Sequence, residues 1–339
     1  MTSFKQWRHS KCLSVGRLLT LLFGIITMTF TLGMGEKMTK LKFSSSPSGV
    51  LYFSTGESIQ KLDLKTRRRQ EIVPGRDREG RSMSNSIFPV YSSKENKMYF
   101  FRSYVWPRKY QLVTFDLENQ KEEETQALDS YIEALSLSPD EQWFAYLLGG
   151  LVTDPTGERA EPRPKRLVVR NLKSGEERVV AEGLNPYFTQ APIWVSNKAL
   201  LYWDISEHMI RVNIFSKEKE DMNFKGLEPC AVSPDGKKVI AIDRRSDFDS
   251  TIYVLDLERK KPELVKRFSH FSLQGAFIWS PNGTSFVYTR QSWSNLLPFQ
   301  EVGNLYWYDL ATKREIKLAD TVSLVGGFWL AEDPAVPEK

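Results

Sequence analysis

Short apolar runs alternate with polar turn segments along residues 42–330, and none of these runs continues with the 3.6-residue period of a long helix. Three close copies of one segment precede such runs: Ala134-Leu-Ser-Leu-Ser-Pro-Asp140, Cys230-Ala-Val-Ser-Pro-Asp-Gly236 and Phe277-Ile-Trp-Ser-Pro-Asn-Gly283. The runs that follow them are Trp143–Leu148, Lys238–Ile242 and Ser285–Thr289. Proline presets φ in a turn and glycine accepts a positive φ, so each copy predicts a strand, a tight turn and a second strand.

A second signature completes each copy, an apolar strand that ends in Asp-Leu or a close relative. Its six instances end at Leu64, Leu117, Leu172, Ile214, Leu257 and Leu310. The Asp or Asn before each of these residues is expected to accept backbone N–H bonds in the turn that follows. A fourth copy of the first segment lies at Ser46–Phe53, and degenerate copies without the proline lie at Tyr91–Phe101 and Ile193–Trp203. The chain therefore contains six copies of a four-strand unit.

The repeat length is about 47 residues, which at four strands per copy predicts the blade of a β-propeller. We expect an all-β fold with six four-stranded antiparallel blades, and seven blades are the alternative. Ser323–Trp329 resembles Ser272–Ile278, where the last blade begins. The final strand is therefore expected to complete a blade that the N-terminal strands began, which leaves no open sheet edge. Lys40–Ser44 is the competing strand for that place.

The Ser-Pro-Asp-Gly turn, the apolar strand after it and the later Tyr-x-x-Asp-Leu together resemble the repeat of TolB-type six-bladed β-propellers. The resemblance covers roughly residues 42–330. It implies a periplasmic, envelope-associated scaffold. Two departures from the TolB pattern stand out: the α/β domain that precedes the propeller in TolB is missing, and the copies around Ser93 and Asn197 lack Pro-Asp.

The N-terminus has the pattern of an export signal. Residues 1–17 are basic, and an uncharged apolar run, Leu18–Gly35, follows them. This pattern predicts an N-terminal hydrophobic helix that acts as a signal peptide or a signal anchor, with the body of the protein outside the cytoplasm, periplasmic or at the cell surface. The expected organisation is this leader over 1–35, a linker over 36–46, the propeller over 42–330 and a tail over 331–339.

Charge and cysteine content narrow the function classes. The formal net charge is +5, and Lys5, Arg8, Lys11 and Arg17 of the leader supply four of these charges. The body is nearly neutral, so nucleic acid is excluded as an expected partner. Cys230 is the one cysteine outside the leader, so no internal disulfide is expected in the body, and we predict a small buried side chain there.

Enzyme signatures are absent from the sequence: it contains no Gly-x-Ser-x-Gly, P-loop or dinucleotide motif. His208 and His270 are far apart and predict no metal site, and no cofactor is expected. Asp243, Asp247 and Asp249 lie among arginines and predict a solvated loop rather than a calcium site. The enzyme hypothesis that stays open is a lyase or hydrolase acting on an anionic glycan at the channel mouth. Its candidate residues are Arg244, Arg245, His208, His270 and Asp247 or Asp249.

The placement of long loops points to a binding face. With strands a to d in each blade, the a–b and c–d turns share one face, and the b–c and d–a connections share the other. The long insertions are all b–c loops: Arg102–Tyr110, Gly149–Pro164, Asp243–Thr251 and Arg290–Asn304. Insertions confined to one face of a repeat scaffold usually mark its binding face.

The loops on this face are rich in aromatic residues and arginine, which protein-binding hot spots favour. The candidate partner-binding residues are Tyr104, Trp106, Arg108, Lys109, Arg76, Arg78, Arg81, Trp293 and Phe299. The alternative is that the loops pack on one another and cap the channel. We expect a monomeric, exported, non-enzymatic propeller that binds a protein or envelope component, with membrane contact only through the N-terminal segment.

Overall fold

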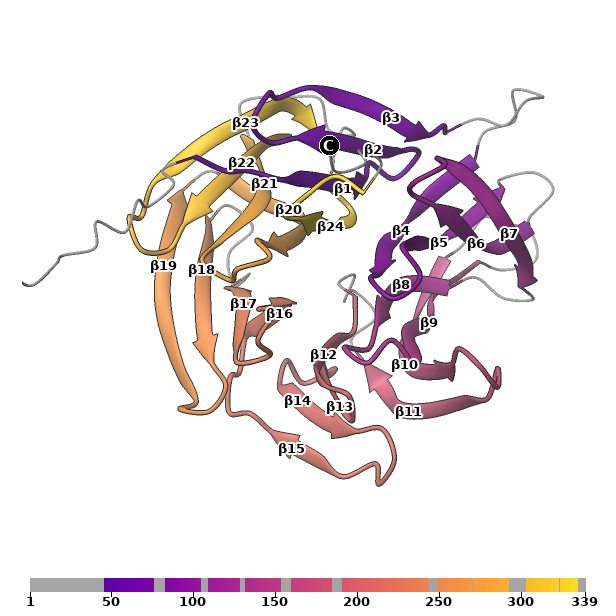
Figure 1. The fold of residues 1–339 in the computed structure, drawn as a ribbon. Coiled ribbons are helices and arrows are strands. Elements are labelled where there is room, and N and C mark those ends of the chain that lie inside the picture. The colour runs from indigo at the N-terminus through magenta and orange to yellow at the C-terminus, as the bar shows by residue number, and fades with distance from the viewer. Residues whose placement is uncertain are drawn as a thin grey trace, which may run out of the picture. The chain divides into compact units, whose positions relative to one another are not determined.

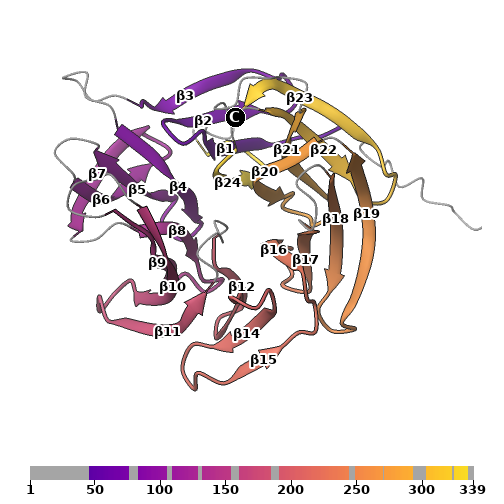
Figure 2. The ribbon, with the colours of Figure 1, turned by 180° about the vertical axis from the view of Figure 1, so that it is seen from behind.

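The computed structural model describes residues 46–75, 83–104, 109–128, 132–153, 160–184, 191–243, 249–269, 271–292, 303–322 and 324–334. Over these residues, 24 strands form six four-stranded antiparallel sheets. The sheets are the blades of a propeller around a central channel, and Figures 1 and 2 show the two faces of this ring. The predicted all-β, six-bladed fold is confirmed, and the seven-bladed alternative is wrong.

The strands of each blade are called a to d from the channel outwards. Blade 1 consists of β24 (Gly326–Leu330), β1 (Val50–Ser54), β2 (Ile59–Asp63) and β3 (Arg69–Val73). Blade 2 consists of β4 (Met83–Ser92), β5 (Lys97–Tyr104), β6 (Lys109–Asp116) and β7 (Lys121–Leu128). Blade 3 consists of β8 (Ile132–Leu137), β9 (Trp143–Thr153), β10 (Ala160–Asn171) and β11 (Glu177–Leu184).

The other three blades follow the chain in the same way. Blade 4 consists of β12 (Ile193–Ser196), β13 (Ala199–Trp203), β14 (Met209–Asn213) and β15 (Lys219–Asp221). Blade 5 consists of β16 (Leu227–Val232), β17 (Lys238–Asp243), β18 (Asp249–Asp256) and β19 (Lys261–Ser269). Blade 6 consists of β20 (Phe271–Trp279), β21 (Ser285–Ser292), β22 (Gly303–Asp309) and β23 (Glu315–Val322).

The Ser-Pro-Asp segments form the a–b turns, as predicted. In blade 3 the Ser138 hydroxyl donates to Asp140 Oδ1 at 2.6 Å and accepts from the Trp143 N–H at 3.0 Å. Ser233 and Ser280 make the corresponding bonds in blades 5 and 6. These bonds satisfy turn groups that the strand ladder leaves unpaired, so the serine aligns strand a with strand b.

The hydrophobic core lies between the blades. Among the described residues, buried apolar side chains form six clusters, and each cluster joins two neighbouring blades. The cluster between blades 1 and 6, for example, contains Leu62, Leu64 and Trp307. Because every blade needs a neighbour on each side to bury its two faces, the ring must close to complete the core.

The last strand closes the ring. β24 pairs with β1 from Val50↔Leu330 to Ser54↔Gly326, so the predicted role of the C-terminal strand is confirmed. The Phe328 ring stacks on Tyr52 of blade 1 and on Tyr91 of blade 2, at centroid distances of 5.2 and 5.3 Å. The competing strand, Lys40–Ser44, lies outside the described residues.

The propeller forms one compact unit over Ser45–Lys339. The predicted hydrophobic helix over residues 18–35 lies outside the described residues. In the part of the chain that the structure describes, no helix has the length and hydropathy needed to cross a membrane.

Candidate functional site

A cavity of about 990 Å³ lies in the central channel, and the a strands of all six blades line it. Its wall is mainly apolar and includes Val90, Leu135, Val195, Val232, Phe277 and Phe328. The a–b turns contribute Ser93, Pro139, Pro234 and Pro281 at one end. The channel therefore presents chiefly hydrophobic side chains together with a few hydroxyl and backbone groups.

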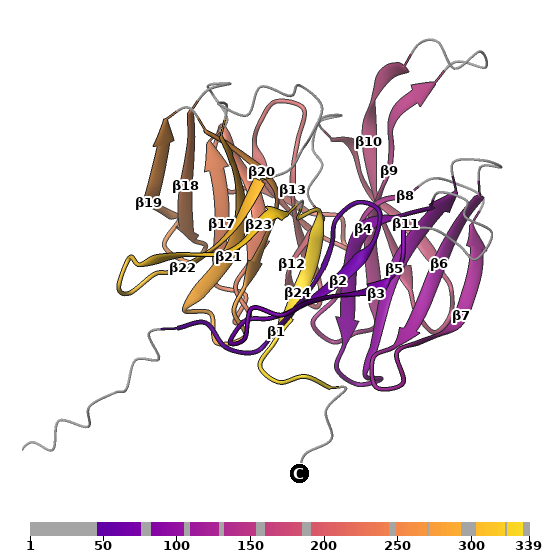
Figure 3. The same ribbon diagram turned by 90° about the horizontal axis from the view of Figure 1, so that it is seen from above.

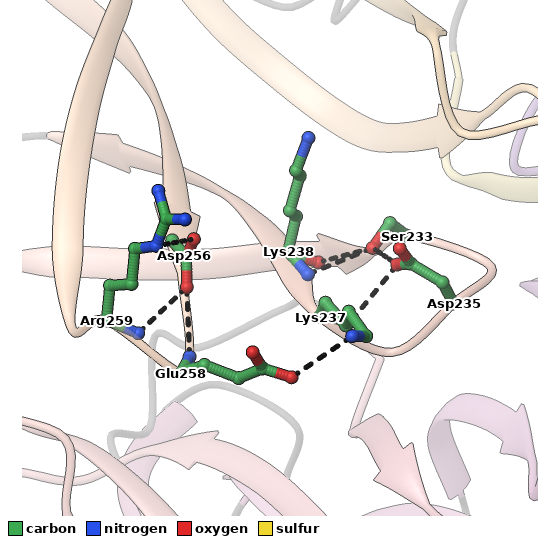
Figure 4. Close-up of polar contacts among 7 residues, drawn as sticks. All are labelled: Ser233, Asp235, Lys237, Lys238, Asp256, Glu258 and Arg259. Carbon is green, nitrogen blue, oxygen red and sulfur yellow. Dashed lines mark hydrogen bonds and ion pairs between the residues drawn. The ribbon is translucent and has the colours of Figure 1, made fainter.

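Among the described residues that line this cavity, Asp235 is the one with a charged side chain. Its carboxylate accepts a hydrogen bond from Ser233 Oγ at 2.5 Å and another from the Lys237 N–H at 3.1 Å. The bond from Ser233, followed by the bond from the Lys237 backbone, holds the pKa of Asp235 below its usual value. This carboxylate shapes the a–b turn of blade 5 (Figure 4).

The c–d turns have one construction in all six blades. In each, the Asp or Asn of the second signature accepts a backbone N–H bond from the turn residues, as predicted. The acceptors are Asp63, Asp116, Asn171, Asn213, Asp256 and Asp309. In blade 5, an ion pair between Lys237 and Glu258 at 3.3 Å also joins the c–d turn to the a–b turn (Figure 4). The face that carries these turns is therefore built of tight, internally bonded turns.

The opposite face carries the b–c hairpins, and the structure corrects their predicted extent. The β5–β6 ladder continues to the Tyr104↔Lys109 pair, and the β9–β10 ladder continues to Thr153↔Ala160. Residues 102–104 and 149–153 are therefore strands rather than loops, because cross-strand hydrogen bonds satisfy their backbone groups. Figure 3 shows β9 and β10 extending beyond the neighbouring strands on this face.

Two of the nine predicted partner-binding residues lie within the described residues. Tyr104 and Lys109 form the last backbone pair of β5 and β6, so the structure brings these two together. The other seven lie outside the described residues: Trp106, Arg108, Arg76, Arg78, Arg81, Trp293 and Phe299. Their proposed role therefore remains a prediction.

Two buried cations on the b–c side were not predicted. Lys165 is 2% exposed, and its amine lies 2.5 Å from Glu133 of β8. Arg102 is 6% exposed, forms two hydrogen bonds with Glu122 and lies over the Phe100 ring. A register shift in β10 between Arg163 and Arg166 interrupts the strand alternation at Lys165, so period-2 reasoning could not place this side chain. Each pair links two strands that are separated by one other strand of the blade, β10 with β8 and β5 with β7, and removing one partner would leave a buried charge.

The candidate residues of the enzyme hypothesis are only partly described. His208 Nδ1 lies 2.6 Å from Asp221 Oδ2, and this hydrogen bond, with one from the Asn223 N–H, holds the pKa of Asp221 below its usual value. Asp249 begins β18 and is exposed. Arg244, Arg245, Asp247 and His270 lie outside the described residues. The described part of the chain contains no group of three or more His, Cys, Asp or Glu side chains arranged to hold a metal ion.

Cys230 is buried, as predicted. It is 6% exposed on β16, and its thiol donates to the Glu228 carbonyl at 3.4 Å. It packs among Ile240, Val254 and Phe277, between blades 5 and 6.

The closed ring of six four-stranded blades defines the protein class as a β-propeller. No protein-family model and no curated protein matches the sequence. The structure is similar to TolB from Acinetobacter baumannii, with a TM-score of 0.62, 14% identity, and coverage of 85% of this chain and 69% of that one. It is also similar to a putative TolB from Agrobacterium tumefaciens, with a TM-score of 0.56, 13% identity, and coverage of 86% and 95%.

An oligogalacturonate lyase in complex with manganese has the same fold. Its TM-score is 0.51 at 14% identity, with coverage of 78% of this chain and 70% of that one. At these identities the likeness concerns the fold alone. The chain is therefore a six-bladed β-propeller, and its fold is similar to that of these TolB structures.

Proposed function

We propose that this protein is an exported, non-enzymatic propeller that binds a protein or another component of the cell envelope through its b–c face. The observation that carries this proposal is the one-sided elaboration of the ring. All six c–d turns are short and internally bonded, whereas β9 and β10 lengthen one b–c hairpin to Thr153↔Ala160. A rigid ring that projects long hairpins from one face is a scaffold for a broad protein contact.

The channel supports a binding role more than a catalytic one. Its described lining is mainly apolar, and its one charged side chain, Asp235, is bonded within its own turn. Acid–base catalysis needs titratable groups within hydrogen-bond reach of a substrate. The TolB-type architecture adds support for a protein partner, and the basic and apolar leader supports a location outside the cytoplasm, with the chain cleaved or anchored at residues 18–35.

The test is a crosslinking pull-down from envelope extract with the full chain as bait. A second bait carries W106A, R108A, W293A and F299A on the b–c side. A matched control bait carries F215A and R259A, which remove an exposed aromatic ring and an exposed arginine from the turn face. We expect a partner that the first and third baits retain and the second loses. Equal retention by all three would contradict the assignment of the b–c face, provided that all baits have the same melting temperature.

The alternative is an enzyme that acts on an acidic glycan, and the shared fold of oligogalacturonate lyases makes oligogalacturonate the first substrate to try. A ligand that binds only the folded state must raise the melting temperature. A rise with oligogalacturonate together with turnover would replace the scaffold proposal. No rise and no turnover would remove this alternative.

A further inference from the structure

A basic surface lies where the ring closes, on the face of the a–b and c–d turns. The c–d turn of blade 1 abuts β23 of blade 6, because Arg67 donates from Nη1 to the Lys317 carbonyl. Figure 1 shows the strands of blade 1 beside β23 at this seam. Exposed cations lie on both sides of it, and we call them the seam cations: Lys65, Arg67, Arg68, Lys313, Arg314 and Lys317.

The carboxylates of the same segments are already engaged. Over residues 63–69 and 309–320, the sequence has seven cations and four carboxylates. Asp63 and Asp309 accept backbone N–H bonds in their turns, and Asp320 pairs with Lys317 at 2.6 Å. The fourth, Glu315, is ion-paired with Lys266 and Arg290. These two segments therefore carry a net positive charge on a body that is nearly neutral as a whole.

The chain enters the propeller beside this surface. The Gly49 carbonyl, just before β1, accepts the Leu64 N–H from the c–d turn that carries Lys65, Arg67 and Arg68. The sequence between the apolar run that ends at Gly35 and the first described residue, Ser46, is ten residues long. Ten extended residues span at most about 35 Å. If residues 18–35 anchor the chain, this linker therefore limits the distance between Ser46 and the membrane to at most about 35 Å.

We propose that the seam cations form a contact surface for an anionic membrane, so that the anchored propeller rests on the bilayer by this face and turns its b–c hairpins away from it. The proposal rests on the anchored form of the proposed function and adds a second membrane contact to the N-terminal segment. Clustered lysines and arginines next to a membrane anchor are attracted by acidic headgroups within about one Debye length of the surface.

The experiment uses the full chain reconstituted into vesicles of phosphatidylcholine, with or without phosphatidylglycerol. Alkaline extraction reports whether the chain is anchored, and hydrogen exchange reports protection over residues 64–69 and 311–318. We expect exchange in these two turns to be several-fold slower in the anionic vesicles, and the difference to shrink at high salt. The variant K65E/R68E/K313E should lose the protection.

The matched control is K173E/K198E/K217E. It makes the same charge change at exposed lysines on the turn face of blades 3 and 4, and it should keep the protection. Equal exchange in both kinds of vesicle, or equal loss in the two variants, would overturn the proposal. Removal of the protein from the vesicles by alkaline extraction would also overturn the proposal, because the chain would then have no membrane anchor. Protection that an acidic protein produces without lipid would assign the surface to a protein instead. None of these results affects the b–c pull-down, so the two proposals fail separately.

Discussion

The Glu141 carboxylate in the a–b turn of blade 3 accepts a hydrogen bond from the Ser92 hydroxyl of blade 2 at 2.6 Å. It also accepts bonds from the Ser93 hydroxyl at 2.6 Å, the Ser93 N–H at 3.0 Å and the Lys94 N–H at 3.2 Å. In blades 3, 5 and 6 the a–b serine instead donates to an Asp or Asn of its own turn. The copy in blade 2 lacks that residue, and the neighbouring blade supplies the carboxylate.

Replacing Glu141 with glutamine is expected to lower the free energy of unfolding by about 1–2 kcal/mol, because four charge-assisted bonds lose their ionised acceptor. Urea unfolding at pH 7 measures the change. The control is E95Q, one turn position away in blade 2. The Glu95 carboxylate accepts a hydrogen bond from the Tyr99 hydroxyl, whereas the hydroxyls of Ser92 and Ser93 donate to Glu141. E95Q should therefore leave the hydrogen bonds between the Ser92 turn and Glu141 in place. Equal midpoints for E141Q and the parent protein would show that the bridge adds no stability.

The same carboxylate predicts a pH dependence. Burial alone would raise the pKa of Glu141, but the hydrogen bonds from Ser92, Ser93 and Lys94 outweigh burial and lower it. A carboxylate whose pKa is lower in the folded state than in the unfolded state stabilises the fold. This stabilisation is complete above the unfolded-state pKa, near 4.3, and is lost as the pH falls through the folded-state pKa. The stability difference between the parent protein and E141Q should therefore shrink below about pH 4.3. A difference that stays constant down to pH 2 would contradict this assignment.

The repeat predicted the blades and the closing strand because its turn residues recur at fixed positions. Ser233, Asp235 and Gly236 specify one turn by local chemistry, and a local pattern can be recognised in a single sequence. The Glu141 bridge escaped prediction because it joins residues almost fifty positions apart. The b–c loops were predicted too long, because the residues that extend β5 and β9, Arg102–Tyr104 and Gly149–Thr153, do not alternate between apolar and polar side chains. The predicted binding residues stay a prediction, and the described structure shows only that Tyr104 and Lys109 form a backbone pair.

Two turn glycines provide a matched pair of substitutions. Gly236 and Gly283 occupy the same turn position with φ of +72° and +68°, so alanine is strained at both. A Cβ at Gly283 would meet the Pro234 Cδ at 3.5 Å, whereas a Cβ at Gly236 would meet the Val195 carbonyl of blade 4 at 2.9 Å. We expect G283A to cost about 1 kcal/mol and G236A about 2 kcal/mol or more. Thermal or urea unfolding tests the order, and an equal loss would mean that blade 4 shifts freely.

The c–d turns predict that an amide can replace the carboxylate but a methyl group cannot. Asp256 Oδ1 accepts the Glu258 N–H at 3.0 Å and the Arg259 N–H at 2.8 Å, and Asn171 makes the same two bonds in blade 3. D256N should therefore stay within about 0.5 kcal/mol of the parent protein, whereas D256A should lose about 1–2 kcal/mol. Urea unfolding of both variants separates them. A similar loss in both would show that charge, rather than the hydrogen bonds, stabilises this turn.

The stacking of Phe328 between Tyr52 and Tyr91 predicts that one ring in the last strand controls the stability of the closed propeller. F328A removes both stacking contacts and enlarges the channel, so we expect a loss of about 2–3 kcal/mol. L264A on the outer strand β19, where the side chain is 43% exposed, is the control and should change stability by less than about 0.5 kcal/mol. β24 pairs with β1 of blade 1, and its Phe328 ring also contacts Tyr91 of blade 2. A broader urea transition in F328A would therefore indicate that the ring opens before the blades unfold. Binding at the b–c face should persist in F328A below its unfolding midpoint, whereas a partner lost with Phe328 alone would place the contact in the channel.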